Sequence, residues 1–144
     1  MDEIQILIVE DDECLQTALY KSVRMISPGL SVEWASTADQ ALAILRRKRI
    51  DIVISDYYLQ DQVTTGIRIW ERCRRISYKT QFLLMSGMAT QEFVRMTERR
   101  GIILRFLPKP FGLREFQSAV SEMISATRKN QELNNGFQTL LKLA

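Results

Sequence analysis

Residues 6–13 read Ile-Leu-Ile-Val-Glu-Asp-Asp-Glu, so an apolar run passes directly into four carboxylates. The apolar half is rich in β-branched residues, which is typical of a buried strand. A second run of this kind, Ile52 to Ser55, leads straight into Asp56. The carboxyl ends of parallel strands meet at one edge of a sheet. The sequence therefore predicts an acidic group at the edge of a parallel sheet.

The rest of the chain alternates between strand-like and helix-like segments. Strands are expected at residues 4–9, 30–35, 50–55, 81–85 and 102–107, and helices at 13–26, 37–47, 65–76, 90–100 and 113–127. Strands that are joined through helices form parallel sheets by right-handed crossovers. The first, third and fourth strands are apolar on both faces and must lie inside, whereas the second and fifth are more polar and suit the edges. The pattern predicts an α/β fold, a doubly wound five-stranded parallel sheet of order 2-1-3-4-5 with helices on both faces.

Size and composition indicate one globular domain without membrane contact. The chain has 144 residues, of which 46% are hydrophobic and 26% charged, and this suits a single core. No apolar run approaches the roughly 18 residues that span a bilayer, and the acidic start at residues 1–3 is unlike a secretory signal. Two cysteines and no histidine exclude a disulfide scaffold and most zinc chemistry. We therefore expect a cytoplasmic protein.

The basic residues do not by themselves indicate nucleic-acid binding. The net charge is only +3, and the basic clusters, such as residues 46–49, fall at the ends of predicted helices. Cations are favourable there because they complement the helix dipole. We expect no direct contact with nucleic acid in this segment.

The last residues form a separate unit of the sequence. We assign residues 1–127 to the domain and residues 128–144 to an amphipathic C-terminal tail, which is either a linker or a dimerisation helix. Within this tail, apolar residues recur at helical spacing (Leu133, Phe137, Leu140, Leu141 and Ala144). No partner for this stripe is visible in the sequence, so a homodimer is one expectation.

The ends of the predicted strands bring together the side chains of a phosphoryl-transfer site. Glu10 and Asp11 follow the first strand, Asp56 the third, Ser86 the fourth and Lys109 the fifth. Crowded carboxylates repel one another unless a hard cation joins them, and Mg²⁺ prefers such all-oxygen sites. An aspartate can then attack phosphorus while the cation and the lysine neutralise the phosphoryl oxygens and the hydroxyl donates a hydrogen bond.

Four segments together resemble the signature of two-component response regulator receiver domains, of the kind found in chemotaxis regulators. They are residues 6–13, 52–56, 83–87 and 106–111, and the resemblance spans about residues 3–127. It implies a flavodoxin-like fold and a phosphoacceptor signalling domain rather than an enzyme with turnover. It also implies Mg²⁺-dependent transfer from a sensor histidine kinase or phosphotransfer protein, and a downstream output domain or protein.

The resemblance also implies roles for individual residues. Glu10 and Asp11 match the acidic pair that binds Mg²⁺, and Asp56 matches the phosphoacceptor. Ser86 matches the switch hydroxyl, and Lys109 matches the lysine that pairs with the phosphoryl group.

The resemblance also implies roles for two further positions. Phe106 matches the aromatic switch residue, whose turning inward would alter the surface of the fourth helix, fifth strand and fifth helix. Pro110 matches the proline that follows the family's lysine through a cis peptide bond.

The loop after Asp56 departs from the family pattern. It lacks the usual proline, and Gly66 comes ten positions after Asp56 instead of eight, so the loop is about two residues longer. The backbone carbonyl of Tyr58 is the expected metal ligand in this loop. The altered loop keeps open a pseudo-receiver, a binding module that works without phosphorylation.

Two other interpretations also remain open at this point. The acids at residues 10–13 could simply cap the first helix, since acids favour helix N-termini. A phosphatase with an aspartate nucleophile would use similar chemistry, but it carries Asp-x-Asp after the first strand and places its nucleophile there. Sustained hydrolysis of a phosphomonoester would identify such an enzyme.

Overall fold

The computed structural model describes residues 3–57, 66–77, 79–87 and 104–143. Nine elements lie in this part of the chain: β1 (Ile4–Val9), α1 (Glu13–Arg24), β2 (Leu30–Ala35), α2 (Ala38–Arg47), β3 (Ile52–Asp56), α3 (Gly66–Ile76), β4 (Gln81–Ser86), β5 (Leu104–Pro108) and α5 (Leu113–Leu143). The helix expected at residues 90–100 lies outside the described residues.

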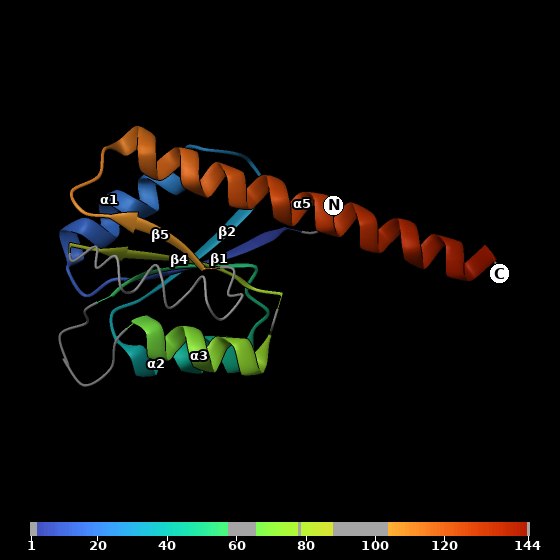
Figure 1. Ribbon diagram of the computed structural model, residues 1–144, viewed down its shortest axis with the longest axis horizontal. Coiled ribbons are helices and arrows are strands. Elements are labelled where there is room, and N and C mark those ends of the chain that lie inside the picture. The colour runs from blue at the N-terminus through green and yellow to red at the C-terminus, as the bar shows by residue number, and fades with distance from the viewer. Residues whose placement is uncertain (1–2, 58–65, 78, 88–103, 144) are drawn as a thin grey trace.

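The five strands form one parallel sheet of order β2-β1-β3-β4-β5. This confirms the predicted order, with the polar strands β2 and β5 at the edges. Helices α1 and α5 cover one face, and α2 and α3 lie on the other (Figure 1). The sheet is therefore the middle of three layers.

A hydrophobic core lies on each face because alternate residues of a strand point to opposite sides. In β1, Ile6 and Ile8 belong to the core beneath α1 and α5, whereas Leu7 and Val9 belong to the core beneath α2 and α3. All four side chains are fully buried. Two-sided burial explains why this strand is apolar at every position from Ile6 to Val9.

The observed helix starts follow the capping residues. Asp12 caps α1, because its side chain accepts a hydrogen bond from Leu15 N–H at 2.9 Å. Thr37 caps α2 and accepts from Gln40 N–H at 3.1 Å. The side-chain oxygen of Gln40 in turn accepts a hydrogen bond from the N–H of Ser36. In a capping box the donor would be the N–H of the cap residue itself, one position later.

The last helix is longer than the sequence predicts. The helix expected over 113–127 continues without a break to Leu143 and includes the weak helix formers Asn134, Asn135 and Gly136. Such residues cost only about 0.5–1 kcal/mol each, whereas the costly nucleation of the helix is already met by its packed first half. The C-terminal part of α5 extends past the body of the domain (Figure 1), and we call residues 128–143 the α5 extension. The domain boundary at residue 127 stays a prediction.

Candidate phosphoacceptor site

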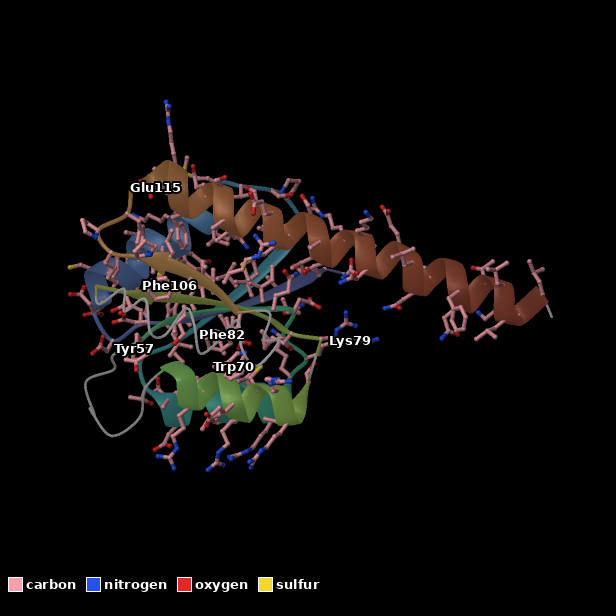
Figure 2. The ribbon with its side chains drawn as sticks, in the orientation of Figure 1. Tyr57, Trp70, Lys79, Phe82, Phe106 and Glu115 are labelled. Carbon is pink, nitrogen blue, oxygen red and sulfur yellow. The ribbon has the colours of Figure 1, made fainter. Side chains whose placement is uncertain are left out.

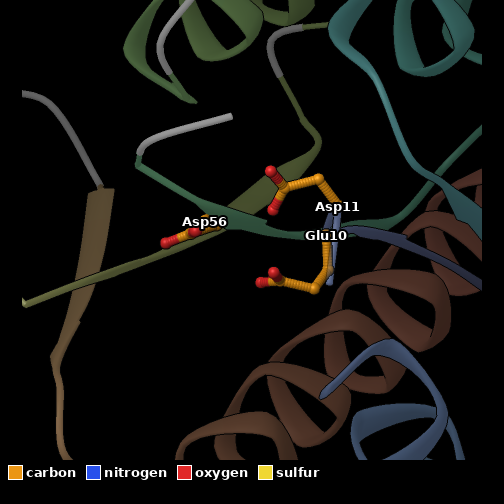
Figure 3. A group of neighbouring side chains, drawn as sticks. All are labelled: Glu10, Asp11 and Asp56. Carbon is orange, nitrogen blue, oxygen red and sulfur yellow. The ribbon is translucent and has the colours of Figure 1, made fainter. Parts of the chain in front are cut away.

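Three carboxylates meet at the carboxyl ends of β1 and β3. Each of Glu10, Asp11 and Asp56 offers an oxygen, and these oxygens all lie within 4.8 Å of one another. Figure 3 shows the three side chains near one another at the ends of two neighbouring strands. The parallel register of the strands causes this, because Val9 pairs with Ser55 and so the next residues of both strands emerge together.

The four acids of the first loop divide into two roles. Glu10 and Asp11 join the cluster with Asp56, as predicted. Asp12 instead caps α1, and Glu13 lies in the first turn of that helix. The capping interpretation is therefore right for the second pair of acids, and the cluster interpretation is right for the first.

Glu10 is the most deeply buried of the three acids, with 2% of its surface exposed. One carboxylate oxygen accepts a hydrogen bond from Asp12 N–H at 3.1 Å. The other, Oε2, is buried and has no hydrogen-bond partner among the described residues. Burial raises the pKa of Glu10 to about 7, and the charge of Asp56 adds to the rise, while the Asp12 N–H opposes it. The charge of Lys109 also lowers the pKa of Glu10, but burial outweighs it.

Asp56 is held by a cation and by the backbone. Lys109 Nζ lies 3.1 Å from Asp56 Oδ1, and the N–H of Tyr57 donates to the same oxygen at 3.0 Å. Asp56 is only 13% exposed and Lys109 28% exposed, so solvent screens this pair incompletely. The sequence did not predict this hydrogen bond from the Tyr57 N–H to Asp56. The position of Asp56 at the end of a strand could have indicated it.

The loop before α5 delivers Lys109 to this site. The N–H of Lys109 donates to the carbonyl of Ser86 at 2.7 Å, and this bond joins the ends of β4 and β5. The peptide bond between Lys109 and Pro110 is cis, as predicted. Ser86 is buried at the end of β4, and Phe106 is half-buried against the core beneath α2 and α3. Figure 2 labels Phe106 and Tyr57 near this end of the sheet.

Gly66 begins α3 directly behind the acceptor strand. A Cβ atom there would lie 2.5 Å from the carbonyl oxygen of Asp56 and 2.5 Å from Leu84 Cδ1. The N–H of Gly66 also donates to the carbonyl of Tyr57 at 2.8 Å. Only glycine fits this approach of backbone to backbone. The sequence marked Gly66 as the end of a long loop, but it did not predict how closely Gly66 approaches Asp56 and Leu84.

Tyr58 and the rest of the long loop, residues 58–65, lie outside the described residues, as does Thr90 to Arg100. The predicted carbonyl ligand is therefore not part of the geometry above. The described residues bring together Glu10, Asp11, Asp56 and Lys109, with Ser86 on the adjoining strand.

A family model for the response regulator receiver domain matches residues 6–121. The chain belongs to this family. Receiver domains are signalling domains rather than classical enzymes, and the carboxylate cluster of this receiver is an arrangement that could hold a metal cation. Among the described residues of the receiver, no helix is both long and apolar enough to cross a membrane.

Two curated relatives contain a segment similar to this receiver. It is 28% identical over 121 residues to the sensor kinase CckA of Brucella abortus, covering 83% of this chain and 12% of that protein. It is 24% identical over 132 residues to a putative NtrX-like response regulator of Rickettsia conorii, and this match covers 92% of this chain and 27% of that protein. The receiver thus spans less than a third of either relative.

Solved structures show the same fold. The non-phosphorylated receiver domain of HemR from Leptospira biflexa is 31% identical, with a TM-score of 0.73 and coverage of 85% of this chain and 94% of that one. A CheY-like receiver domain protein from Methanospirillum hungatei JF-1 has a TM-score of 0.75 over 88% and 98% of the two chains. At 22% identity the second likeness concerns the fold alone.

Proposed function

We propose that this receiver accepts a phosphoryl group on Asp56 and passes the signal on by a change of its surface. The observation that carries the proposal is the position of Lys109 Nζ, 3.1 Å from Asp56 Oδ1 and beside the carboxylates of Glu10 and Asp11. A nucleophilic carboxylate, a cation for the phosphoryl oxygens and an acidic metal-binding pair are the parts that phosphoryl transfer needs.

The donor set of the cluster fits Mg²⁺. All its ligands are carboxylate oxygens, which Mg²⁺ prefers and which zinc and copper do not require. The buried, unpartnered Oε2 of Glu10 is an acceptor that a cation would satisfy. Glu10, Asp11 and Asp56 would hold the ion, and the backbone carbonyl of Tyr58 stays a predicted fourth ligand. When bound, Mg²⁺ supplies positive charge to the carboxylates and to the phosphoryl oxygens.

Asp56 would attack as the nucleophile. A bond forms between an Oδ atom of Asp56 and phosphorus, and the bond from phosphorus to an imidazole nitrogen of the donor breaks. The imidazole keeps that electron pair. The ammonium group of Lys109 already lies against Asp56. During the transfer it would exchange this contact for one with the negatively charged phosphoryl oxygens. The Tyr57 N–H holds the carboxylate in place through the same oxygen.

Ser86 and Phe106 are the proposed switch. Ser86 ends β4, which pairs with the acceptor strand β3, and this supports a role in which its hydroxyl donates to a phosphoryl oxygen on Asp56. Movement of Ser86 would free space into which Phe106 turns, and this would change the surface formed by the fourth helix, β5 and α5. Phe106 packs against the core beneath α2 and α3 and is only half-buried, so it lies at the surface that this change would alter.

The partners follow from this role. The phosphodonor would be a sensor histidine kinase or a phosphotransfer protein in the cytoplasm, and the receiver would act on an output domain or protein. The exposed stripe of the α5 extension, Leu133 to Leu143, also makes a homodimer part of the proposal.

The test is phosphorylation by a small donor. The protein would be incubated with Mg²⁺ and acetyl phosphate, and its intact mass recorded beside that of the Asp56→Asn variant. We expect one base-labile phosphoryl adduct on the native chain, none on the variant and none when EDTA removes the metal. A folded native protein that gains no adduct would contradict the proposal and favour the pseudo-receiver.

A further inference from the structure

A pocket of about 690 Å³ lies between α3 and α5, away from the acidic cluster. Its lining includes Asp51, which precedes β3, and Gln81, the first residue of β4. The acidic cluster lies at the opposite ends of these strands. Strands of five residues place the two sites roughly 17 Å apart. We call this space the α3–α5 pocket.

The α3–α5 pocket is strongly basic. Among the described residues, four cationic side chains line it, Arg49, Arg74, Lys79 and Arg105, against one carboxylate, that of Asp51. They come from four separate segments of the chain, so the tertiary structure brings them together. Figure 2 labels Lys79 beyond the end of α3, on the side toward which α5 extends. Like charges are gathered in this way at sites that bind anions.

The neighbours of the three arginines leave them able to bind an anion. Arg49 pairs with Asp51 at 3.1 Å, and Arg105 pairs with Glu122, whose side chain is 64% exposed. Each guanidinium has five N–H donors, so one carboxylate does not exhaust it. Arg74 has its guanidinium 5.1 Å from the centre of the Trp70 ring, which orients the group. A phosphate would meet several charged donors at once.

The remaining walls suit a purine ring. Trp70, Ala126 and Leu133 add apolar surface, and Leu133 is 64% exposed in the absence of a ligand. Gln131 also lines the pocket, and both polar atoms of its amide are shielded from solvent without a hydrogen-bond partner among the described residues. Such a group is costly to leave unpaired. Because both atoms are buried, the amide would have to turn toward the pocket to meet a ligand, and it would then pair with adenine through one donor and one acceptor.

From the volume, the excess of cations and the unpaired amide, we infer that the α3–α5 pocket binds a purine nucleotide. The phosphates lie among the four cations, and the base lies against Leu133 and the amide of Gln131. A volume of this size is usual for sites that enclose small molecules.

The pocket also spans the point at which α5 leaves the domain. Gln81 Nε2 donates to Thr127 Oγ1 at 2.7 Å and to the Met123 carbonyl at 2.8 Å, which fixes α5 on β4 there. Residues on both sides of Thr127 line the pocket, from Ala126 to Asn134. A bound nucleotide would therefore join the first turns of the α5 extension to the body of the domain.

The test measures binding of ATP by calorimetry with EDTA present, in an Asp56→Asn background that excludes phosphoryl transfer. We expect one site per chain. The Arg74→Ala/Lys79→Ala double variant should bind at least tenfold more weakly, because two charge-assisted contacts are lost. Arg72→Ala is the matched control on α3 and should change the affinity less than twofold, since Arg72 does not line the pocket.

Two further measurements separate the base from the phosphates. Pyrophosphate should bind at least tenfold more weakly than ATP, and Gln131→Leu should weaken ATP but not pyrophosphate. The inference is overturned if ATP shows no saturable binding, if the double variant behaves like Arg72→Ala, or if pyrophosphate binds as tightly as ATP. Tighter binding of a glutamate-rich peptide than of ATP would overturn it as well, in favour of a protein partner. Circular dichroism would verify that each variant is folded.

Discussion

In the described part of the chain, three carboxylates meet one lysine near the carboxyl ends of β1 and β3, whereas four cations and one carboxylate line a pocket near the amino ends of β3, β4 and β5. The same strands connect the two sites, so the sheet carries opposite charge at its two ends. The acidic end consists of residues that directly follow strands, and each keeps its place through the strand itself. The basic end is assembled from two loops, two strands and two helices, and its geometry depends on how α3 and α5 pack.

This difference predicts that the two ends respond differently to substitution. The acidic end holds groups that are buried and electrostatically coupled, so single changes there should have large effects. The basic end holds long, mostly exposed side chains, so single changes should leave the fold almost unaltered.

Lys109→Ala should slow phosphoryl uptake about a hundredfold, because loss of one charged group that stabilises a transition state costs this much. The rate would be measured as growth of the adduct mass in acetyl phosphate and Mg²⁺. Arg72→Ala, which also removes one cation, should alter the rate less than twofold. Equal rates for the native protein and Lys109→Ala would show that the 3.1 Å contact with Asp56 is not used in the chemistry.

Gly66→Ala should lower the free energy of unfolding by about 3 kcal/mol, because the new Cβ would lie 2.5 Å from the Asp56 carbonyl oxygen and force the backbone apart. Urea denaturation would measure this. Gly112→Ala is the control, since its Cβ would meet only Glu115 Oε1, at an ordinary 3.6 Å. Similar stabilities of the two variants would mean that α3 moves away from β3 without cost.

Glu10→Gln should stabilise the metal-free protein above pH 7 and change little near pH 4.5. The pKa of Glu10 is raised to about 7 in the folded state from 4.5, so between these values the folded protein holds a proton that the unfolded chain has lost. Stability therefore falls as the pH rises through this window, by on the order of 2–3 kcal/mol. The variant lacks this titration.

The measurement is urea denaturation in EDTA at pH 5 and pH 8. The native protein should lose stability between these two values relative to Glu10→Gln. The raised pKa would be contradicted if the native and variant proteins differed in their free energy of unfolding by the same amount at pH 5 and at pH 8.

Arg49→Gln, at the basic end, should change the free energy of unfolding by less than about 1 kcal/mol. Its ion pair with Asp51 is short, but the Arg49 side chain is 67% exposed, and exposed pairs contribute little. Asp51 also keeps the hydrogen bond from Gln5 N–H at 2.9 Å. A loss as large as that of Gly66→Ala would show that this end is as tightly coupled as the acidic one.

The sequence by itself determined the alternation of strands and helices, the order of the strands and the residues of the acidic site. These features are local. The apolar residues of a strand show how deeply that strand is buried, and the site residues lie at the ends of strands. For the same reason Glu10, Asp11, Asp56 and Lys109 could be named without coordinates, and the structure brings them together.

Only the tertiary structure decided which acids face the cluster and which cap α1, how closely Gly66 approaches Asp56, and that α5 continues as one helix to Leu143. It alone gathered the cations of the α3–α5 pocket. Each of these depends on the relative placement of elements that are distant in the chain, and side-chain periodicity carries no information about such distances. The buried carboxylate of Glu10 belongs to the same group, since its raised pKa comes from the surrounding protein.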